Sequence, residues 1–295
     1  MCYRVPMHVV GALAADFGAE VAGFDPASPM TADALRKFRH LLYQHALILL
    51  RLPALQPGAQ ASLAAALGQP KNETRTQFAI PGFPMLCRLG NVVDEAGQPT
   101  AFFNRQGEEW HSDGVGSGAV NGITLLHAVD VPRQGGDTLF ASLHTAWETL
   151  DPAVQARIAP LRVLHSFNWH NDKVLALSPG AAKPLTPKER AAIPDRWYDL
   201  VQVHPVCGRT LYYLSPNLVR EITGLDDDQR DELVHQLVGH ASAPQRVYRH
   251  RWAPGDLLVW DNNALMHSAT DVSYYAQDRR LMHRCFTVPA APAAG

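Results

Sequence analysis

The hydrophobic positions of this chain fall mostly into short runs separated by glycine, proline and polar residues. The continuous apolar run 46–50 (ALILL) and the segment 256–261 (DLLVWD) are typical of strands buried on both faces. Further strands are predicted at 17–24, 85–89, 122–128, 135–140, 161–165, 200–205, 210–214, 246–250 and 281–288. Helical spacing is confined to segments after Thr31 and at 59–67, 142–150, 152–159 and 226–239. Many short strands with few helices predict a mainly β fold, a β-sandwich or jelly roll with helical additions.

Composition narrows the classes of protein. The 295 residues, 46% of them hydrophobic, are enough for a single large domain, predicted here over 1–289, with a disordered tail at 290–295. The formal net charge is −2, and no basic stripe of the kind that binds nucleic acid is present. The four cysteines lack zinc-site spacing, and no signal peptide or membrane-spanning run is evident. We therefore expect a cytoplasmic protein with no nucleic-acid or membrane partner, and a homo-oligomer as the default assembly.

The segment 72–106 interrupts the strand pattern with prolines and glycines. Long loops in compact domains usually serve as lids or binding loops, so we interpret this region, extended to about 107, as a lid. Three of its residues are candidate substrate contacts: Asn91, Phe103 and Asn104.

The chemistry concentrates in Trp110-His111-Ser112-Asp113 and in the run from Trp260 to His267. Residues two apart on a strand point to the same face, so His111 and Asp113 can bind one metal ion together. His267 is the candidate for the third ligand. Two histidines and one carboxylate leave the opposite face of the metal open, as non-haem Fe(II) oxygenases require.

A single His-x-Asp triplet is weak evidence, since His170-Asn171-Asp172 repeats the pattern. Two features favour the first triplet. It precedes Gly114, as expected where a strand end opens into a cavity, and its third ligand follows a convincing buried strand. These features favour the first triplet; the family resemblance described below further implies that His170 and Asp172 are polar residues outside the metal site.

Two arginines near the C-terminus indicate an anion site. Strand alternation places Arg280 and Arg284 on one face together with Met282 and Phe286. Arginine in such apolar surroundings needs an anionic partner, and its planar fork suits a carboxylate.

With these motifs in place, the chain resembles the taurine dioxygenase / 2,4-dichlorophenoxyacetate dioxygenase family (TauD/TfdA) of Fe(II)- and 2-oxoglutarate-dependent oxygenases. The matching pieces cover nearly the whole chain in the order of the family: FGAEVAGFD, WHSD, GGDTLF, HPVCGRTLYY, RHRWAPGDLLVWDN, the histidine at 267, and RRLMHR.

The resemblance implies a double-stranded β-helix fold, with His111, Asp113 and His267 as iron ligands and catalytic centre. It further implies that Thr138 and Arg280 bind the distal carboxylate of 2-oxoglutarate. Arg284 would lie at the substrate pocket, facing a carboxylate, sulfonate or sulfate. The segment from His267 to the arginines is two residues longer than in the taurine enzyme, so the two arginines could exchange roles. The loop that supplies a histidine and a tyrosine to taurine in that enzyme is here 72–81 (NETRTQFAIP), which argues against taurine.

The function that these residues predict is hydroxylation, desaturation or oxidative cleavage of a small organic substrate, with Fe(II), 2-oxoglutarate and dioxygen and with release of succinate and carbon dioxide. Two alternatives stay open at this point. One is a metal-dependent oxygenase or hydrolase that does not use 2-oxoglutarate, and the other is a non-catalytic jelly roll that binds a small anion.

Overall fold

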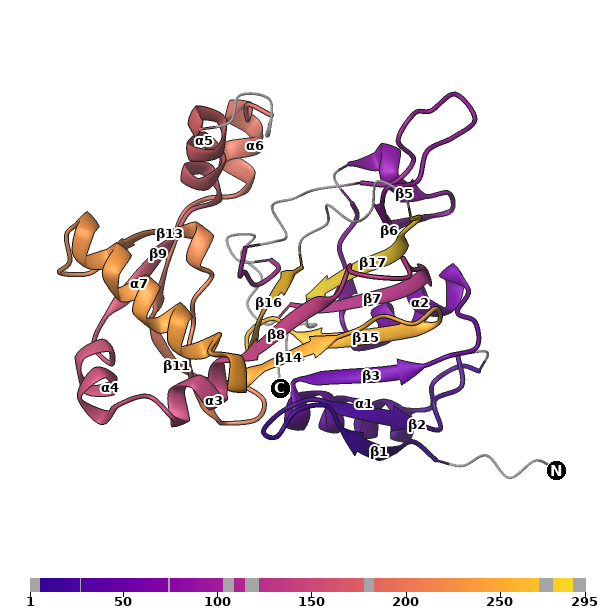
Figure 1. Ribbon diagram of the computed structural model, residues 1–295, viewed down its shortest axis with the longest axis horizontal. Helices are drawn as coiled ribbons and strands as arrows, with labels where there is room; N and C mark the ends of the chain where they lie inside the picture. The colour runs from indigo at the N-terminus through magenta and orange to yellow at the C-terminus, as the bar shows by residue number, and fades with distance from the viewer. Residues whose placement is uncertain are drawn as a thin grey trace.

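The computed structural model describes residues 6–26, 28–73, 75–102, 109–114, 122–177, 183–270 and 278–288. Within these ranges a large sheet contains β1 (His8–Ala12), β2 (Ala19–Ala22), β3 (Leu47–Arg51), β4 (Gln69–Pro70), β5 (Ala79–Ile80), β6 (Phe83–Gly90), β7 (Ile123–Asp130), β15 (Asp256–Asp261) and β17 (Leu281–Val288). A smaller sheet contains β8 (Thr138–Ser142), β14 (Val247–His250) and β16 (Leu265–Ala269). The strand orders are β1-β2-β3-β15-β7-β17-β6-β5, with β4 beside β17, and β14-β8-β16 (Figure 1).

Two helices cover the outer face of the large sheet, α1 (Ala32–His45) and α2 (Pro57–Leu67). The first helix begins because the Thr31 hydroxyl accepts a hydrogen bond from the Ala34 N–H. It ends at Ala46, which has a left-handed φ of 61° that turns the chain directly into β3.

Alternate residues of the apolar strands enter two different cores, which explains their continuous hydrophobic character. On β3, Ile48 and Leu50 pack against α1 and α2, whereas Leu47 and Leu49 face the smaller sheet. The inner core between the two sheets also contains Trp260, together with the other side chains of the large sheet that point toward the smaller sheet. The predicted jelly-roll architecture is therefore confirmed.

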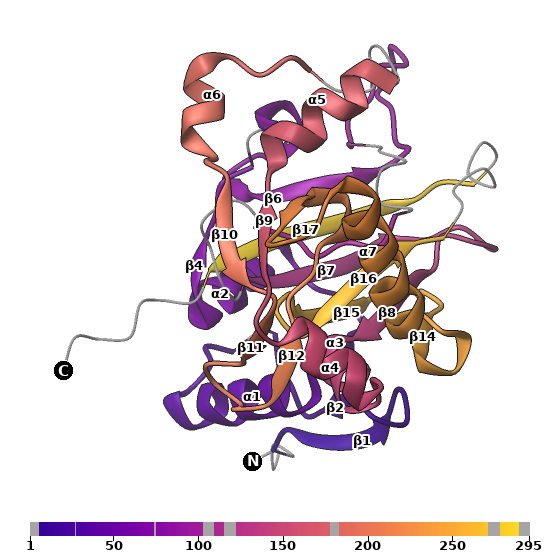
Figure 2. The ribbon, with the colours of Figure 1, turned by 90° about the vertical axis from the view of Figure 1, so that its left-hand side faces the viewer.

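A helical lobe formed by residues 143–246 packs against the smaller sheet from outside, and it stands in front of the sheets in Figure 2. Its helices are α3 (Leu143–Glu148), α4 (Pro152–Ile158), α5 (Phe167–Leu177), α6 (Pro187–Ala192) and α7 (Asp227–Ala241). Its strands are β9 (Arg162–His165), β10 (Arg196–Asp199), β11 (Val201–Val203), β12 (Thr210–Tyr212) and β13 (Val219–Ile222). Short 3-10 helices complete the fold: η1 (Thr76–Phe78), η3 (Pro216–Leu218) and η4 (Pro244–Arg246).

The interpretation of the segment 72–106 needs correction. It contains η1, β5 and the whole of β6, which is longer than the strand predicted at 85–89. Beyond β6, isolated bridges join Leu89 to Phe102 and Val93 to Pro99, so the described part of this segment is held to the sheet by backbone hydrogen bonds. Residues 103–106 and the predicted tail lie outside the described residues.

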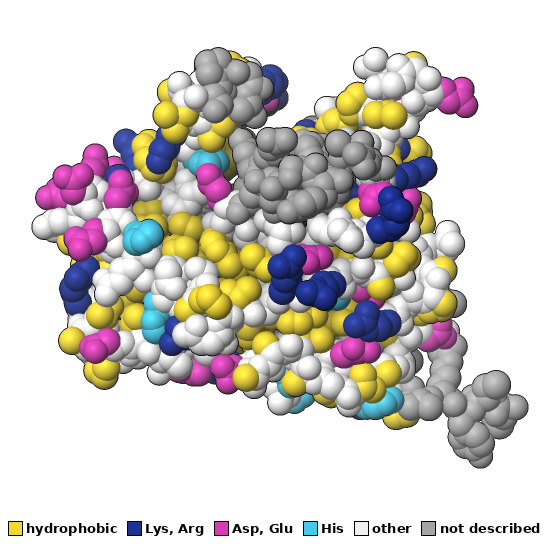
Figure 3. Space-filling model, viewed as in Figure 1, with side chains coloured by type: hydrophobic (Ala, Val, Ile, Leu, Met, Phe, Trp, Pro, Cys, Tyr) yellow, Lys and Arg dark blue, Asp and Glu magenta, His cyan; other side chains and the backbone are white. Residues whose placement is uncertain are grey.

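The surface adds two observations. On the face in Figure 3, basic side chains lie in small groups beside acidic ones rather than in a continuous stripe. No helix in the described part of the chain has the length and apolar character needed to span a membrane.

Candidate metal centre

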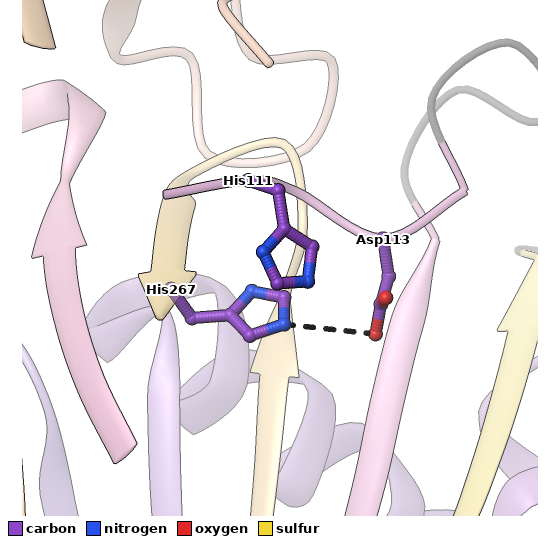
Figure 4. A group of neighbouring side chains, drawn as sticks. All are labelled: His111, Asp113 and His267. Carbon is purple, nitrogen blue, oxygen red and sulfur yellow. Dashed lines mark ion pairs between the residues drawn. The ribbon is translucent and has the colours of Figure 1, made fainter. Parts of the chain in front are cut away.

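The backbone brings two of the predicted ligands together. His111 lies in an extended segment beside β16, and its N–H and C=O form a pair of hydrogen bonds with those of His267, at 2.9 and 2.8 Å. This bridge places His111 beside β16, at the edge of the smaller sheet. Asp113 follows two residues later and points to the same side as His111 (Figure 4).

The three side chains converge on one point. One ligand atom from each of His111, Asp113 and His267 lies within 4.8 Å of the other two, and the His267 Nε2 to Asp113 Oδ2 distance is 3.9 Å (Figure 4). Ligand atoms at about 2.1 Å from one ion can be at most about 4.2 Å apart, so the His267–Asp113 distance fits a shared metal. No other group of three or more potential ligands occurs within the described residues.

The hydrogen bonds of His111 fix which nitrogen can bind metal. Its Nδ1 lies 2.7 Å from the Glu109 carbonyl oxygen, so Nδ1 carries the proton and donates it there. The lone pair of Nε2 is then available to a metal. The His267 ring is held by packing against Phe140 and Trp260, with centroids 6.1 and 5.0 Å away.

Electrostatics keep the carboxylate and the buried imidazole in the protonation states that a metal needs. Burial alone would raise the pKa of Asp113, but the charges of Arg284, His267 and His111 outweigh it and lower the pKa to about 2. Burial and the neighbouring His111 lower the pKa of His267 to about 3, although Asp113 opposes this. At neutral pH Asp113 is therefore ionised and His267 is neutral.

A second layer of polar groups orients Asp113. The Thr124 hydroxyl donates to Asp113 Oδ2 at 2.8 Å, and the Asp113 N–H donates to Asn262 Oδ1 at 3.0 Å. Asn262 is held in turn by the Trp260 indole N–H and by its own bonds to Thr124 and the Gly122 carbonyl. The side chain of Asn262 thus braces the backbone at Asp113.

Steric crowding explains why a glycine, Gly114, follows Asp113. Gly114 has φ of +79°, and a Cβ there would lie 2.2 Å from the Phe286 ring. Gly122 meets the same ring, so the aromatic side chain of β17 can enter between the two segments only because both lack side chains.

Thr138, the predicted co-substrate contact, lies on the inner face of the smaller sheet. On β8 it is two residues from Phe140, which is paired across the strands with His267, so the three side chains share one face. The Trp252 indole N–H donates to the Thr138 hydroxyl oxygen at 3.1 Å. This leaves the hydroxyl hydrogen of Thr138 available to an acceptor such as a carboxylate.

Arg284 lies within β17, an inner strand of the large sheet, whereas Arg280 and Asn91 lie where the paired strands β17 and β6 begin and end. Arg284 on β17 places Nη1 3.7 Å from Asp113 Oδ1. Arg280 lies just before β17, and its backbone N–H donates to Asn91 Oδ1 at 2.8 Å, while Asn91 Nδ2 donates to the Asp278 carbonyl. The Asn91 amide therefore fastens β6 to the entry of β17, and its contact with substrate stays a prediction.

The predicted substrate contacts Phe103 and Asn104 lie outside the described residues.

Three residues near the centre were not predicted from the sequence and are found only in the structure: Thr124, Trp252 and Glu73. Thr124 and Trp252 reach predicted site residues from 11 and 114 positions away, and only strand pairing reveals these contacts. Glu73, whose side chain is 7% exposed, pairs with Arg284 at 3.6 Å and was likewise missed.

Fold and site together define a class of protein, a jelly-roll dioxygenase with a two-histidine, one-carboxylate metal centre. Residues 10–286 match the family described as taurine catabolism dioxygenase TauD, TfdA family. Pentalenolactone F synthase of Streptomyces avermitilis is 27% identical over 98% of this chain and 94% of its own. The 2,4-dichlorophenoxyacetate dioxygenase of Cupriavidus pinatubonensis, named as dependent on alpha-ketoglutarate, is 26% identical over 93% and 96%. Among solved structures, AAD-2 in complex with Mn(II) and N-oxalylglycine superimposes with a TM-score of 0.78 and 25% identity, covering 98% and 100%.

The chain belongs to the TauD/TfdA dioxygenase family. The family and the enzyme class predicted from the sequence are therefore confirmed.

Proposed function

We propose that His111, Asp113 and His267 hold Fe(II) and that this centre, with 2-oxoglutarate as co-substrate, oxidises a small organic molecule by hydroxylation, desaturation or oxidative cleavage. The observation that supports this best is the convergence of the three ligand atoms within 4.8 Å on one side of the smaller sheet. When bound, iron and 2-oxoglutarate supply dioxygen activation coupled to release of succinate and carbon dioxide. The carboxylate of Asp113 fills the position that a halogenating centre would leave to chloride, so an oxygenase outcome is favoured.

The protein positions the reactants. We propose that Arg280 pairs with the distal carboxylate of 2-oxoglutarate and that the Thr138 hydroxyl donates a hydrogen bond to it. The Trp252 N–H supports this role, because it occupies the oxygen of Thr138 and directs its hydrogen elsewhere. Backbone bonds to Asn91 fix the chain at Arg280, so the co-substrate meets a preorganised site.

We propose that the substrate carries a carboxylate, sulfonate or sulfate and that Arg284 faces it. The Arg284 guanidinium lies beside Asp113, the proposed metal ligand, and the Arg284 side chain is 26% exposed. Asn91, Phe103 and Asn104 remain proposed contacts for the rest of the substrate. The relative from Cupriavidus pinatubonensis is named for an aryloxyacetic acid, which supports an organic acid in general rather than that compound.

The test of the proposed function is spectroscopic and requires no knowledge of the substrate. Anaerobic addition of Fe(II) and 2-oxoglutarate should produce a weak visible charge-transfer band that Fe(II) alone does not produce. A protein that binds Fe(II) but gives no band with 2-oxoglutarate would contradict the proposal. Once the band is established, a panel of small organic acids can be screened for substrate-stimulated succinate release.

A further inference from the structure

The guanidinium of Arg284 is paired but not saturated. Among the described residues its ion-pair partners are Asp113 at 3.7 Å and Glu73 at 3.6 Å, both beyond hydrogen-bonding distance. A guanidinium has five N–H donors, and these should find acceptors when they are largely removed from water. Within the described residues, neither carboxylate therefore takes up an N–H donor of Arg284 in a hydrogen bond.

Glu73 joins Arg284 to a second arginine. Glu73 Oε1 accepts hydrogen bonds from the backbone N–H and the Nε–H of Arg75, at 3.0 and 3.1 Å, while Oε2 faces Arg284. Burial alone would raise the pKa of Glu73, but the N–H and charge of Arg75, with Arg284, lower it to about 2. Glu73 is therefore ionised and lies between two cations.

This arrangement leaves a local excess of positive charge. Two guanidinium groups share the one carboxylate of Glu73, and the other carboxylate near Arg284 is Asp113, whose charge would be shared with a bound metal. Arg75 and Arg284 have side chains that are 37% and 26% exposed, so both can be reached by a small molecule.

Arg75 is also oriented. Its Cζ lies 3.8 Å from the centroid of the Phe102 ring, a stacked position that fixes the plane of the guanidinium. Phe102 is itself packed against Phe78, with ring centroids 5.7 Å apart. Nε of Arg75 is bound to Glu73 and one face of the guanidinium is covered by Phe102, so within the described residues the terminal amino groups are the part of Arg75 that an acceptor can reach.

We propose that Arg75 and Arg284 together bind the acid group of the substrate, with Glu73 holding both guanidinium groups in place. This inference rests on the proposed function and deepens it, because it adds a second cation that selects for an oxyanion. The competing interpretation is that Arg75 forms only a local ion pair within its loop.

Inorganic sulfate is the probe, titrated by calorimetry into the full chain loaded with Mn(II) and 2-oxoglutarate so that the co-substrate site is filled. Arg75→Gln should weaken sulfate binding by about ten-fold, as expected for loss of a charged hydrogen-bond donor. Arg284→Gln should weaken it at least as much.

The matched control is Arg209→Gln, which breaks another partly exposed arginine–glutamate pair, with Glu148. Its sulfate affinity should equal that of the wild type. Arg75→Lys provides a second variant that keeps the charge but loses the planar fork, and its affinity should fall between the wild type and Arg75→Gln.

Equal affinity in the Arg75→Gln and Arg209→Gln variants would overturn the proposal, and so would absence of sulfate binding in the wild type. Failure of the proposed function has a different signature. The Fe(II) and 2-oxoglutarate band would then be missing, while sulfate binding to the metal-loaded chain could still depend on Arg75.

Discussion

The two His-x-Asp triplets of this chain have the same pattern and opposite surroundings. His111 lies in an extended segment and Asp113 at the turn that follows it, and both side chains meet His267. His170 and Asp172 lie on α5, where residues two apart do not face each other. Secondary structure, rather than the triplet itself, decides whether the pair can bind one metal.

Their carboxylates differ just as clearly. The Asp113 side chain is 15% exposed and accepts a hydrogen bond from the Thr124 hydroxyl, while its backbone N–H donates to Asn262 Oδ1. The Asp172 side chain is 50% exposed and pairs with Arg190 on α6 at the surface. The side chain between His170 and Asp172 is used to hold the fold, since Asn171 donates to the Lys183 carbonyl. One triplet is thus built into a site and the other fastens two helices.

The largest effect should come from removing the carboxylate of the first triplet. Asp113→Ala should lower Mn(II) affinity by more than about 100-fold and abolish 2-oxoglutarate turnover, because one of three ligands is lost. Asp172→Ala is the control and should leave Mn(II) affinity unchanged. Electron paramagnetic resonance of free Mn(II) measures both, and equal losses in the two variants would break the comparison.

The next effect concerns the arginines. Arg280→Ala should raise the apparent Michaelis constant for 2-oxoglutarate by about two orders of magnitude, since a carboxylate loses its charged partner. Arg190→Ala, which removes the arginine beside the second triplet, should not change it. If Arg284→Ala produced the loss instead, the two arginines of the site would have to exchange roles.

A smaller effect should follow from the second layer. Thr124→Val removes the hydroxyl that donates to Asp113 and should weaken Mn(II) binding by about ten-fold. Thr287→Val is the matched control, because Thr287 is fully buried on β17 and its hydroxyl has no hydrogen-bond partner among the described residues. An equal change in both variants would indicate a packing effect rather than orientation of the ligand.

A second buried pair of histidines, His127 and His283, predicts how the stability of the fold depends on pH. His127 and His283 face each other across β7 and β17, and burial lowers the pKa of both to about 4. The unfolded chain therefore binds more protons than the folded one between about pH 6.5 and 4, so stability should decrease as pH falls through this range. Denaturant titrations at several pH values should show a shallower decrease for His127→Leu, and an unchanged slope would contradict burial of a neutral pair.

The smallest effect should come from the surface pair of the second triplet. Asp172→Asn should shift the melting temperature only slightly, because exposed ion pairs contribute little to stability. A large loss of stability, measured by circular dichroism, would mean that α5 and α6 depend on this pair more than its exposure suggests.

The sequence predicted those parts of the fold whose signals are local. Strand β3 is a continuous apolar run, and α1 and α7 have N-cap side chains at Thr31 and Asp226 that bond as expected. The strands β1, β4, β5, β10, β13 and β16 and the helices α5 and α6 were not predicted. Helix α5 contains the polar run from Asn168 to Lys173, which gives no clear apolar face, and β16 is a short strand whose pairing with β8 is a long-range property.

The candidate site divides in the same way. The triad is predicted from residue types and order, and the structure brings its three side chains close together. The contacts of Thr124, Trp252 and Glu73 join residues that are close only after strands pair, and their side chains have no motif of their own. Such supporting residues need coordinates to be found.

The backbone bridge between His111 and His267 has a consequence for how the centre is loaded. Its two hydrogen bonds join main-chain atoms, so they hold the ligand positions whether or not an ion is bound. The metal would then be exchangeable and would not be required for folding, so a chelator should remove it without unfolding the chain. Reconstitution with another divalent ion should succeed directly on the folded apoprotein, and the added ion should raise its stability only through binding linkage.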